Sequence, residues 1–137
     1  MNGWVCPDCH RRFARSRQPH ECFPAMSLEE YFSTGPPHEQ PVFDAVRAYL
    51  ETLGPIHVEP VSVGIFIKKE GSWVELRPMT KWVAMSFPMP RRITHGQITR
   101  KPIEAGRRWF HYVNLREPDD LTEDVKEWLA ESYAFSQ

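Results

Sequence analysis

The sequence has few cysteines and no long apolar run. Only three of its 137 residues are cysteine, and all three lie between Trp4 and Cys22. No apolar stretch reaches the roughly 18 residues that a membrane-spanning helix needs, and the N-terminus lacks the charged and then apolar pattern of a signal peptide. We therefore expect a cytoplasmic protein with no membrane contact. In a reducing compartment, three closely spaced cysteines favour metal binding over disulfide bonds.

Motifs of common enzyme classes are also missing. The sequence contains no Gly-x-Ser-x-Gly elbow, no phosphate-binding glycine loop and no His-Glu-x-x-His helix. No aspartate occurs between Asp44 and Asp119, so the clustered carboxylates of a metal-dependent nuclease are not evident. His95 and His111 could act as acid and base, although alternation around His111 favours a histidine on a sheet face. We expect a non-catalytic binding protein, with a small nuclease or hydrolase as the less favoured alternative.

The cysteines and one histidine have the spacing of a metal site. Cys6-x-x-Cys9 is followed after ten residues by His20-x-Cys22. Zinc takes sulfur and nitrogen ligands at about 2.0–2.3 Å, and four protein ligands define a closed, structural site. We predict one structural Zn²⁺ held by Cys6, Cys9, His20 and Cys22. Two alternatives stay open: His10 could replace His20, and the Cys-x-x-Cys pair could be a redox site.

A metal would also supply stability that so short a segment lacks. Ordering each residue costs about 1–2 kcal/mol of backbone entropy, and only Trp4 and Phe13 offer an apolar floor. A structural zinc contributes about 10–16 kcal/mol to peptides of this kind at pH 7. We therefore expect chelation to unfold this segment while the rest of the chain keeps its own cooperative transition.

Charge is divided unevenly along the chain, although the net charge is only −1. Residues 77–108 hold eight basic residues and one acidic residue, whereas residues 109–137 hold two basic and seven acidic residues. A basic segment next to aromatic side chains is typical of proteins that neutralise phosphates and stack bases. We predict nucleic-acid binding through residues 77–108 and the metal-binding segment. The residues expected to contact phosphate are Arg11, Arg12, Arg15, Arg91, Arg92, Arg100, Lys101, Arg107 and Arg108.

Other interpretations of these basic residues stay open. The arginines near the cysteines could balance the negative charge of three thiolates around one Zn²⁺, and residues 77–108 could pair with the acidic last helix. The same surfaces could contact another protein, so an adaptor is the alternative function. The sequence does not indicate the oligomeric state.

Hydrophobic periodicity predicts helices at both ends of a run of strands. A capping box at Ser27 and Glu30 predicts a short helix over 28–33. Two longer helices are expected at 41–53 and 122–133 because apolar residues recur there every three or four positions. The expected strands are 61–67, 73–77, 82–87 and 108–115, with a further short one near Ile98 in an otherwise exposed loop over 89–106.

This order of elements predicts an α+β fold with two modules. We expect an antiparallel sheet of four to five strands packed with two helices, preceded by a small zinc-finger module. The expected divisions are a zinc finger over residues 1–25 (the finger), a linker with a short helix over 26–40, and an α+β domain over 41–137.

Four stretches of this sequence resemble a known family. They are WVCPDCHRRFARSRQPHEC, VFDAVRAYLETLGPIHVEPVSVGIFI, WVAMSFPM and HYVNLREPDDLTEDVKEWLAESY, and together they are similar to the domain-of-unknown-function family 5655 in versions with an N-terminal zinc finger. Relatives often read NQxHSC where this chain reads RQPHEC, a change that keeps His20 and Cys22. The resemblance implies a compact α+β fold with two packed helices, and it implies no activity.

Overall fold

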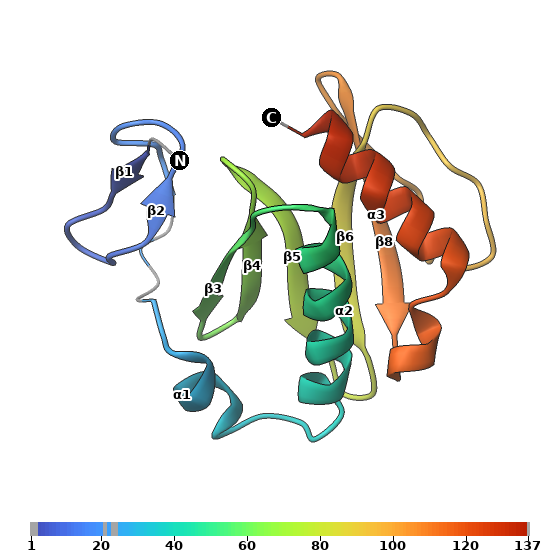
Figure 1. The fold of residues 1–137 in the computed structure, drawn as a ribbon, viewed down its shortest axis with the longest axis horizontal. Helices are drawn as coiled ribbons and strands as arrows, with labels where there is room; N and C mark the ends of the chain where they lie inside the picture. The colour runs from blue at the N-terminus through green and yellow to red at the C-terminus, as the bar shows by residue number, and fades with distance from the viewer. Residues whose placement is uncertain (1–2, 21, 23–24, 137) are drawn as a thin grey trace.

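A six-stranded antiparallel sheet forms the centre of the computed structural model, which describes residues 3–20, 22 and 25–136. The strands follow the order β3-β4-β5-β6-β8-β7, and α2 and α3 lie on one side of them (Figure 1). A separate hairpin, β1–β2, belongs to the finger. The elements are β1 Trp4–Val5, β2 Arg12–Phe13, α1 Leu28–Phe32, α2 Glu39–Leu53, β3 His57–Val61, β4 Gly64–Lys68, β5 Ser72–Pro78, β6 Val83–Met89, β7 Ile103–Ala105, β8 Arg108–Leu115, the 3-10 turn Pro118–Asp120 and α3 Glu123–Phe135.

The α+β class is confirmed, but the predicted number of strands is wrong. The strand expected over 61–67 is two strands, β3 and β4, joined by a two-residue turn at Ser62 and Val63. Val61 pairs with Gly64, so it lies on the same face as Glu59 and Phe66, whereas Ile65 and Ile67 lie on the opposite face. The alternation of apolar residues over 61–67 thus resembled that of one strand, although Val63 lies in the turn and is 36% exposed.

Residues near the edges of the sheet account for the other differences. Strand β6 continues through Pro88 to Met89, although prolines were expected to end it. The pairing of β5 with β6 ends at Ser86, so Pro88 pairs only with Phe110 of β8 and has no partner strand on its β5 side, where a proline is tolerated. Strand β7 was not expected, since all three of its residues are exposed and carry no apolar pattern. Near Ile98 there is a single bridge to Val113 instead of a strand.

Two of the three helices begin at side-chain caps, of which Ser27 was predicted, while α2 begins at Glu39, two residues before its predicted start. The Ser27 side chain accepts a hydrogen bond from the Glu30 N–H at 3.1 Å, and Thr122 accepts one from Val125 at the start of α3. Helix α1 lies within the predicted linker, yet its Tyr31 is buried and donates a hydrogen bond to Glu39 of α2. The divisions 1–25, 26–40 and 41–137 stay predictions. No helix among the described residues is long and apolar enough to cross a bilayer.

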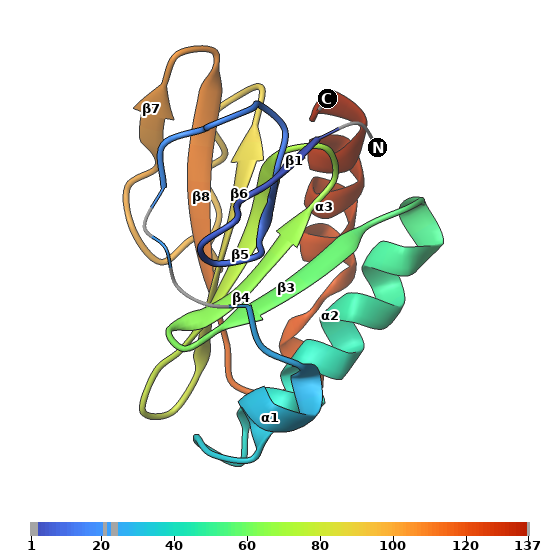
Figure 2. The ribbon, with the colours of Figure 1, turned by 90° about the vertical axis from the view of Figure 1, so that its left-hand side faces the viewer.

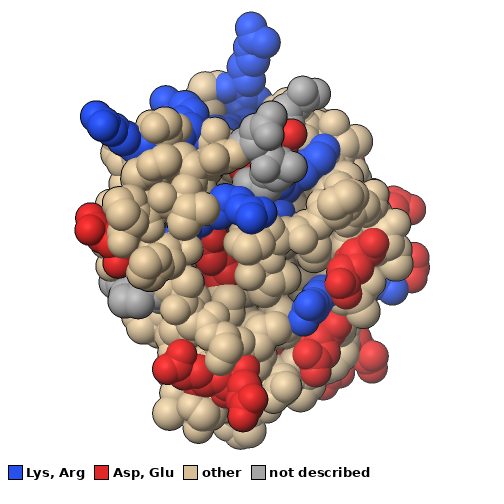
Figure 3. Space-filling view, turned by 60° about the vertical axis from the view of Figure 1, so that its left-hand side comes forward, with Lys and Arg blue, Asp and Glu red and all other residues tan. Residues whose placement is uncertain are grey.

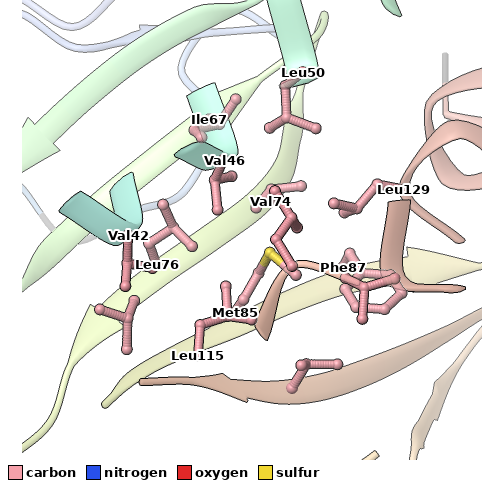
Figure 4. Packing of buried hydrophobic residues seen from close by; sticks show 14 of the residues in the cluster. Val42, Val46, Leu50, Ile67, Val74, Leu76, Met85, Phe87, Leu115 and Leu129 are labelled. Atoms are coloured by element: carbon pink, nitrogen blue, oxygen red, sulfur yellow. The ribbon is translucent and has the colours of Figure 1, made fainter. Parts of the chain in front are cut away.

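The core lies between the two long helices and the sheet (Figure 4). Helix α2 contributes its predicted apolar face, including Val46 and Leu50, and α3 contributes Leu129. The facing strands supply side chains at alternate positions, as expected for a sheet with one face buried by helices. The fully buried strand residues in this layer include Ile65, Ile67, Leu76, Met85, Phe87, Val113 and Leu115.

The opposite face of the sheet (the open face) carries more polar side chains, including Glu59, Lys68, Glu75 and Ser86. One row crosses it in register, because Glu59 pairs with Phe66, Phe66 with Glu75, Glu75 with Ser86, and Ser86 with Tyr112. The finger lies in front of this face in Figure 2. Its Arg11 and Arg12 contact Glu59 at the β3–β4 end of the row, and no described residue of the finger lines the groove at the β5-β6-β8 end.

Candidate metal centre and basic surfaces

Four side chains of the finger converge in the way the sequence predicted. The ligand atoms of Cys6, Cys9, His20 and Cys22 all lie within 4.8 Å of one another, so the cluster could hold a metal ion. The Cys6 and Cys22 Sγ atoms are 3.8 Å apart, and His20 Nε2 is 3.4 Å from Cys9 Sγ and 3.3 Å from Cys22 Sγ.

These separations fit a tetrahedral ion. With metal bonds of about 2.3 Å to sulfur and 2.0–2.1 Å to nitrogen, tetrahedral angles place two sulfurs about 3.8 Å apart and a sulfur and a nitrogen about 3.5 Å apart. The observed distances are close to both values. Four protein donors complete such a shell, which leaves no position for substrate or water.

The surroundings of His20 orient it as a ligand. Its Nδ1 is 2.6 Å from the Gln18 carbonyl oxygen, so Nδ1–H donates there and Nε2 is free for a metal. The imidazole stacks on Phe13 with ring centroids 3.9 Å apart, and Trp4 packs edge-on against it. His10 is exposed and lies outside the cluster, with a left-handed φ of 62°. The structure therefore favours His20 over His10.

Two thiols of the cluster, Cys6 and Cys22, have shifted pKa values. Hydrogen bonding from the Cys9 backbone N–H lowers the pKa of Cys6 to about 7. Desolvation, with the adjacent Cys6 and Cys9 sulfurs, raises the pKa of Cys22 to about 11. The raised pKa of Cys22 reflects the cost of desolvating a thiolate and of placing it close to the other sulfurs. A divalent ion would offset this cost, because metal-coordinated thiols are deprotonated outright.

A buried carboxylate joins the finger to the sheet. Glu59 of β3 is 3% exposed and accepts from Arg11 Nε at 2.7 Å and from the Arg12 N–H at 3.1 Å. Its Oε1 is also 2.9 Å from Lys68 Nζ of β4, and Lys68 donates to the Arg12 carbonyl at 2.6 Å. The Lys68 ammonium lies 4.1 Å from the centre of the Phe13 ring. One hub of charges thus fixes the finger on the open face.

The partners of Glu59 keep it ionised. Burial alone would raise the pKa of its carboxyl, but hydrogen bonds from Arg11, the Arg12 backbone and Lys68 outweigh burial and hold the pKa below its ordinary value. Neither Glu59 nor Lys68 was predicted as a site residue from the sequence. The available signal was a charged residue inside each of two apolar strands, HVEPV and GIFIK.

Of the residues predicted to contact phosphate, three meet at one groove. Arg15 of the finger and Arg107 and Arg108 of the β7–β8 turn line a groove of about 560 Å³ (the basic groove) together with Gln18 and Lys69. The turns that carry them lie at the same end of the molecule in Figure 1. Figure 3 shows basic side chains gathered at this upper end and acidic ones mostly on the lower half and the right flank.

The remaining predicted residues are divided among other places. Arg11 is buried at the Glu59 hub and Arg12 contributes its backbone there. Arg91 forms two hydrogen bonds of 3.0 Å with Glu131 of α3, which matches the alternative that the basic segment pairs with the last helix. The other three, Arg92, Arg100 and Lys101, line a shallow pocket of the loop after β6.

Both candidate catalytic histidines have their ring nitrogens occupied. His111 is buried, and its Nε2 accepts from the Ile93 N–H at 2.9 Å while Nδ1 donates to the Trp109 carbonyl. In His95, Nδ1 accepts from the Gln97 N–H and Nε2 faces Asp124 at 3.1 Å. Within the described residues, the cysteine and histidine cluster is also the one place where three or more potential metal ligands converge.

The environment of His111 predicts a loss of stability in acid. Burial lowers its pKa, with nearby Arg91 and Arg92 adding to the effect. Below the ordinary histidine pKa of about 6.5, the unfolded chain binds a proton that the folded chain resists, so stability present above that pH is lost as the pH falls. Urea unfolding should show that the free energy of unfolding falls more between pH 7 and pH 5 for the wild type than for His111→Gln. Equal drops would contradict this role.

Comparison with known proteins identifies one family. Residues 28–136 match the model of the family described as "Domain of unknown function (DUF5655)", and the finger lies before the matched region. No match was found among curated proteins or among solved structures.

Proposed function

The chain belongs to the family described as a domain of unknown function (DUF5655), and from its own residues we propose that it is a zinc-containing, non-catalytic nucleic-acid-binding protein. In this proposal the metal folds the finger, the Glu59 hub holds the finger on the sheet, and basic side chains of both parts contact phosphates. Arg15, Arg107 and Arg108 are the principal contacts.

Zinc is the metal that best fits the cluster. Three thiolates and one imidazole favour a borderline-soft cation, and the separations of the ligand atoms agree with zinc bond lengths. The site lies beside a short hairpin and not at the strand-to-helix junction of thioredoxin-like enzymes, which argues against a redox role for Cys6 and Cys9.

The observation that carries the proposed function is the basic groove. Its cations come from the finger and from the β7–β8 turn, which are about ninety residues apart in the chain, so only the docked finger brings them together. The fourth cation of the groove, Lys69, is bound by the Tyr133 and Ser136 carbonyls at the end of α3. The three exposed arginines are therefore the groups available for phosphate.

Salt dependence tests the basic groove. Each neutralised phosphate of a single strand changes the slope of log affinity against log salt by about 0.7. Replacing Arg15, Arg107 and Arg108 with alanine should therefore weaken binding of a fluorescent oligonucleotide at low salt and reduce the slope by about 2. Fluorescence anisotropy between about 50 and 200 mM salt measures both quantities.

A second triple variant provides the matched control. Alanine at Arg47, Lys81 and Arg116 removes the same charge from positions outside the basic groove and should leave the slope nearly unchanged. Equal effects of the two triple variants would show that only net charge matters. If the wild type binds neither single-stranded nor double-stranded probes at low salt, the nucleic-acid proposal is wrong and the adaptor alternative replaces it.

A further inference from the structure

A second groove lies on the open face beyond the finger. We propose that this groove stacks an unpaired base, so that the ligand of the protein is a single strand of nucleic acid. The inference rests on the proposed function, because the phosphates of the same strand would occupy the basic groove. Beyond the proposed function, this inference specifies that the ligand is single-stranded and that Tyr112 distinguishes it from a duplex.

The geometry of this groove (the sheet groove) suits a flat ring. It has a volume of about 320 Å³ and is lined by side chains of three adjacent strands and two loops. Small residues, Ala84 and Ser86, occupy the middle strand β6, while the larger Tyr112 rises on the neighbouring β8. Small side chains between large ones leave a slot whose wall is an aromatic ring. The lining residues are Glu75, Arg77, Met79, Ala84, Ser86, Arg100 and Tyr112.

An arginine already uses the stacking surface of Tyr112. The Arg100 guanidinium carbon lies 3.5 Å from the centre of the Tyr112 ring, which places the cation on the ring face. The loop that carries Arg100 is held to β8, because the Thr99 N–H donates to the Tyr112 carbonyl at 3.0 Å. Because the guanidinium covers this face of the ring, a base entering the sheet groove would stack on the guanidinium or displace it from Tyr112, and both are surfaces on which unpaired bases stack.

Strand β8 connects the sheet groove to the basic groove. Arg108, Phe110 and Tyr112 alternate along β8 and therefore point to the same face of the sheet. Arg108 lines the basic groove, and its guanidinium carbon is 5.6 Å from the centre of the Phe110 ring. Phe110 and Tyr112 are both half-buried, so part of each ring is accessible. One extended strand could thus place phosphates at Arg108 and successive bases on Phe110 and Tyr112.

The charges around the sheet groove agree with a nucleic-acid strand. Arg77 and Arg100 line it, and its one acidic residue, Glu75, is already paired with Arg77. A duplex would satisfy the phosphate contacts but not the stacking, because its bases are stacked on one another. The chemistry of the sheet groove therefore selects single strands over duplexes.

Substitution of Tyr112 tests this inference directly. A fluorescein-labelled 12-nucleotide oligothymidine and a 12-base-pair duplex serve as probes. Tyr112→Leu should weaken binding of the single strand about tenfold, because base–aromatic stacking of this kind contributes that much or more per base. Its salt slope should not change, since tyrosine releases no counterions. Binding of the duplex should be unaffected.

Two controls separate stacking from folding and from charge. Tyr112→Phe keeps the ring and should retain the affinity for oligothymidine. Tyr49→Leu removes a tyrosine ring on the helical side of the sheet and should leave that affinity unchanged. Unchanged affinity of Tyr112→Leu for oligothymidine would overturn the inference while the proposed function stands. Failure of the wild type to bind either probe would instead remove the proposed function, and this inference with it.

A measurement on the unmodified protein covers the case in which Tyr112→Leu does not fold. Oligothymidine with one 5-iododeoxyuridine can be photo-crosslinked to the wild type and the adduct located by mass spectrometry. Adducts on Phe110 or Tyr112 would support the inference. Adducts confined to other parts of the chain would overturn it.

Discussion

Replacing Glu59 with glutamine is expected to lower the free energy of unfolding by about 3–5 kcal/mol, the usual cost of removing one member of a buried charge pair. The loss arises because the carboxylate neutralises two cations at once. Arg11 is 5% exposed and Lys68 is fully buried, so neither can reach water while the finger stays in place. Urea unfolding followed by tryptophan fluorescence at pH 7 gives the value.

A glutamate on the surface provides the comparison for Glu59. Glu51 of α2 is 55% exposed and lies 3.7 Å from Arg47 one helical turn away, an arrangement worth about 0.3–0.5 kcal/mol. Glu51→Gln should therefore have little effect. Were Glu59→Gln to cost no more than Glu51→Gln, the hub would not be buried in solution and the finger would not be docked as described.

Removal of the metal, by chelation or by Cys9→Ser, is expected to unfold the finger and leave the six-stranded sheet folded. Among the residues that the structure describes, Trp4 and Phe13 are the apolar side chains packed around the cysteines of the finger, whereas metal binding supplies about 10–16 kcal/mol in peptides of this kind. The sheet should nevertheless become less stable, because Glu59 and Lys68 lose their partners in the finger. The basic groove loses Arg15 in the same event, so nucleic-acid affinity should also fall.

Amide hydrogen exchange can follow the two parts separately. The Cys6 N–H is bonded to the Arg11 carbonyl at 2.9 Å and the His10 N–H to the Cys6 carbonyl at 2.8 Å, so both should lose protection when a chelator is added. Amides in the paired strands β6 and β8 should stay protected, and added zinc should restore the finger. Persistent protection of Cys6 and His10 in the chelator would mean that packing, not metal, folds this segment.

Features set by neighbouring residues were predictable from the sequence, whereas features set by distant residues were not. The metal ligands lie within seventeen residues, and Cys-x-x-Cys and His-x-Cys spacings restrict the geometry by themselves. The predicted helix cap at Ser27 likewise follows from a contact with Glu30, three residues away. In contrast, Arg11 and Glu59 are separated by 48 positions, and nothing local to either one specifies the pairing.

The same reason explains why the sequence did not indicate where the basic residues lie in the fold. Residues 77–108 hold an excess of positive charge. The sequence does not show on which surfaces of the fold these basic side chains lie. Arg107 and Arg108 join Arg15 only because the finger docks beside the β7–β8 turn, while Arg91 turns toward Glu131 of α3. Docking is a tertiary event, and a pattern of charge along one chain does not contain it.

The most direct test of the account is the metal content of the purified protein. Protein prepared in reducing buffer without added metal should contain one zinc ion per chain by mass spectrometry of the elements, and Cys9→Ser should contain almost none. A wild-type protein with no stoichiometric metal would contradict the central claim that an ion bound by Cys6, Cys9, His20 and Cys22 folds the finger.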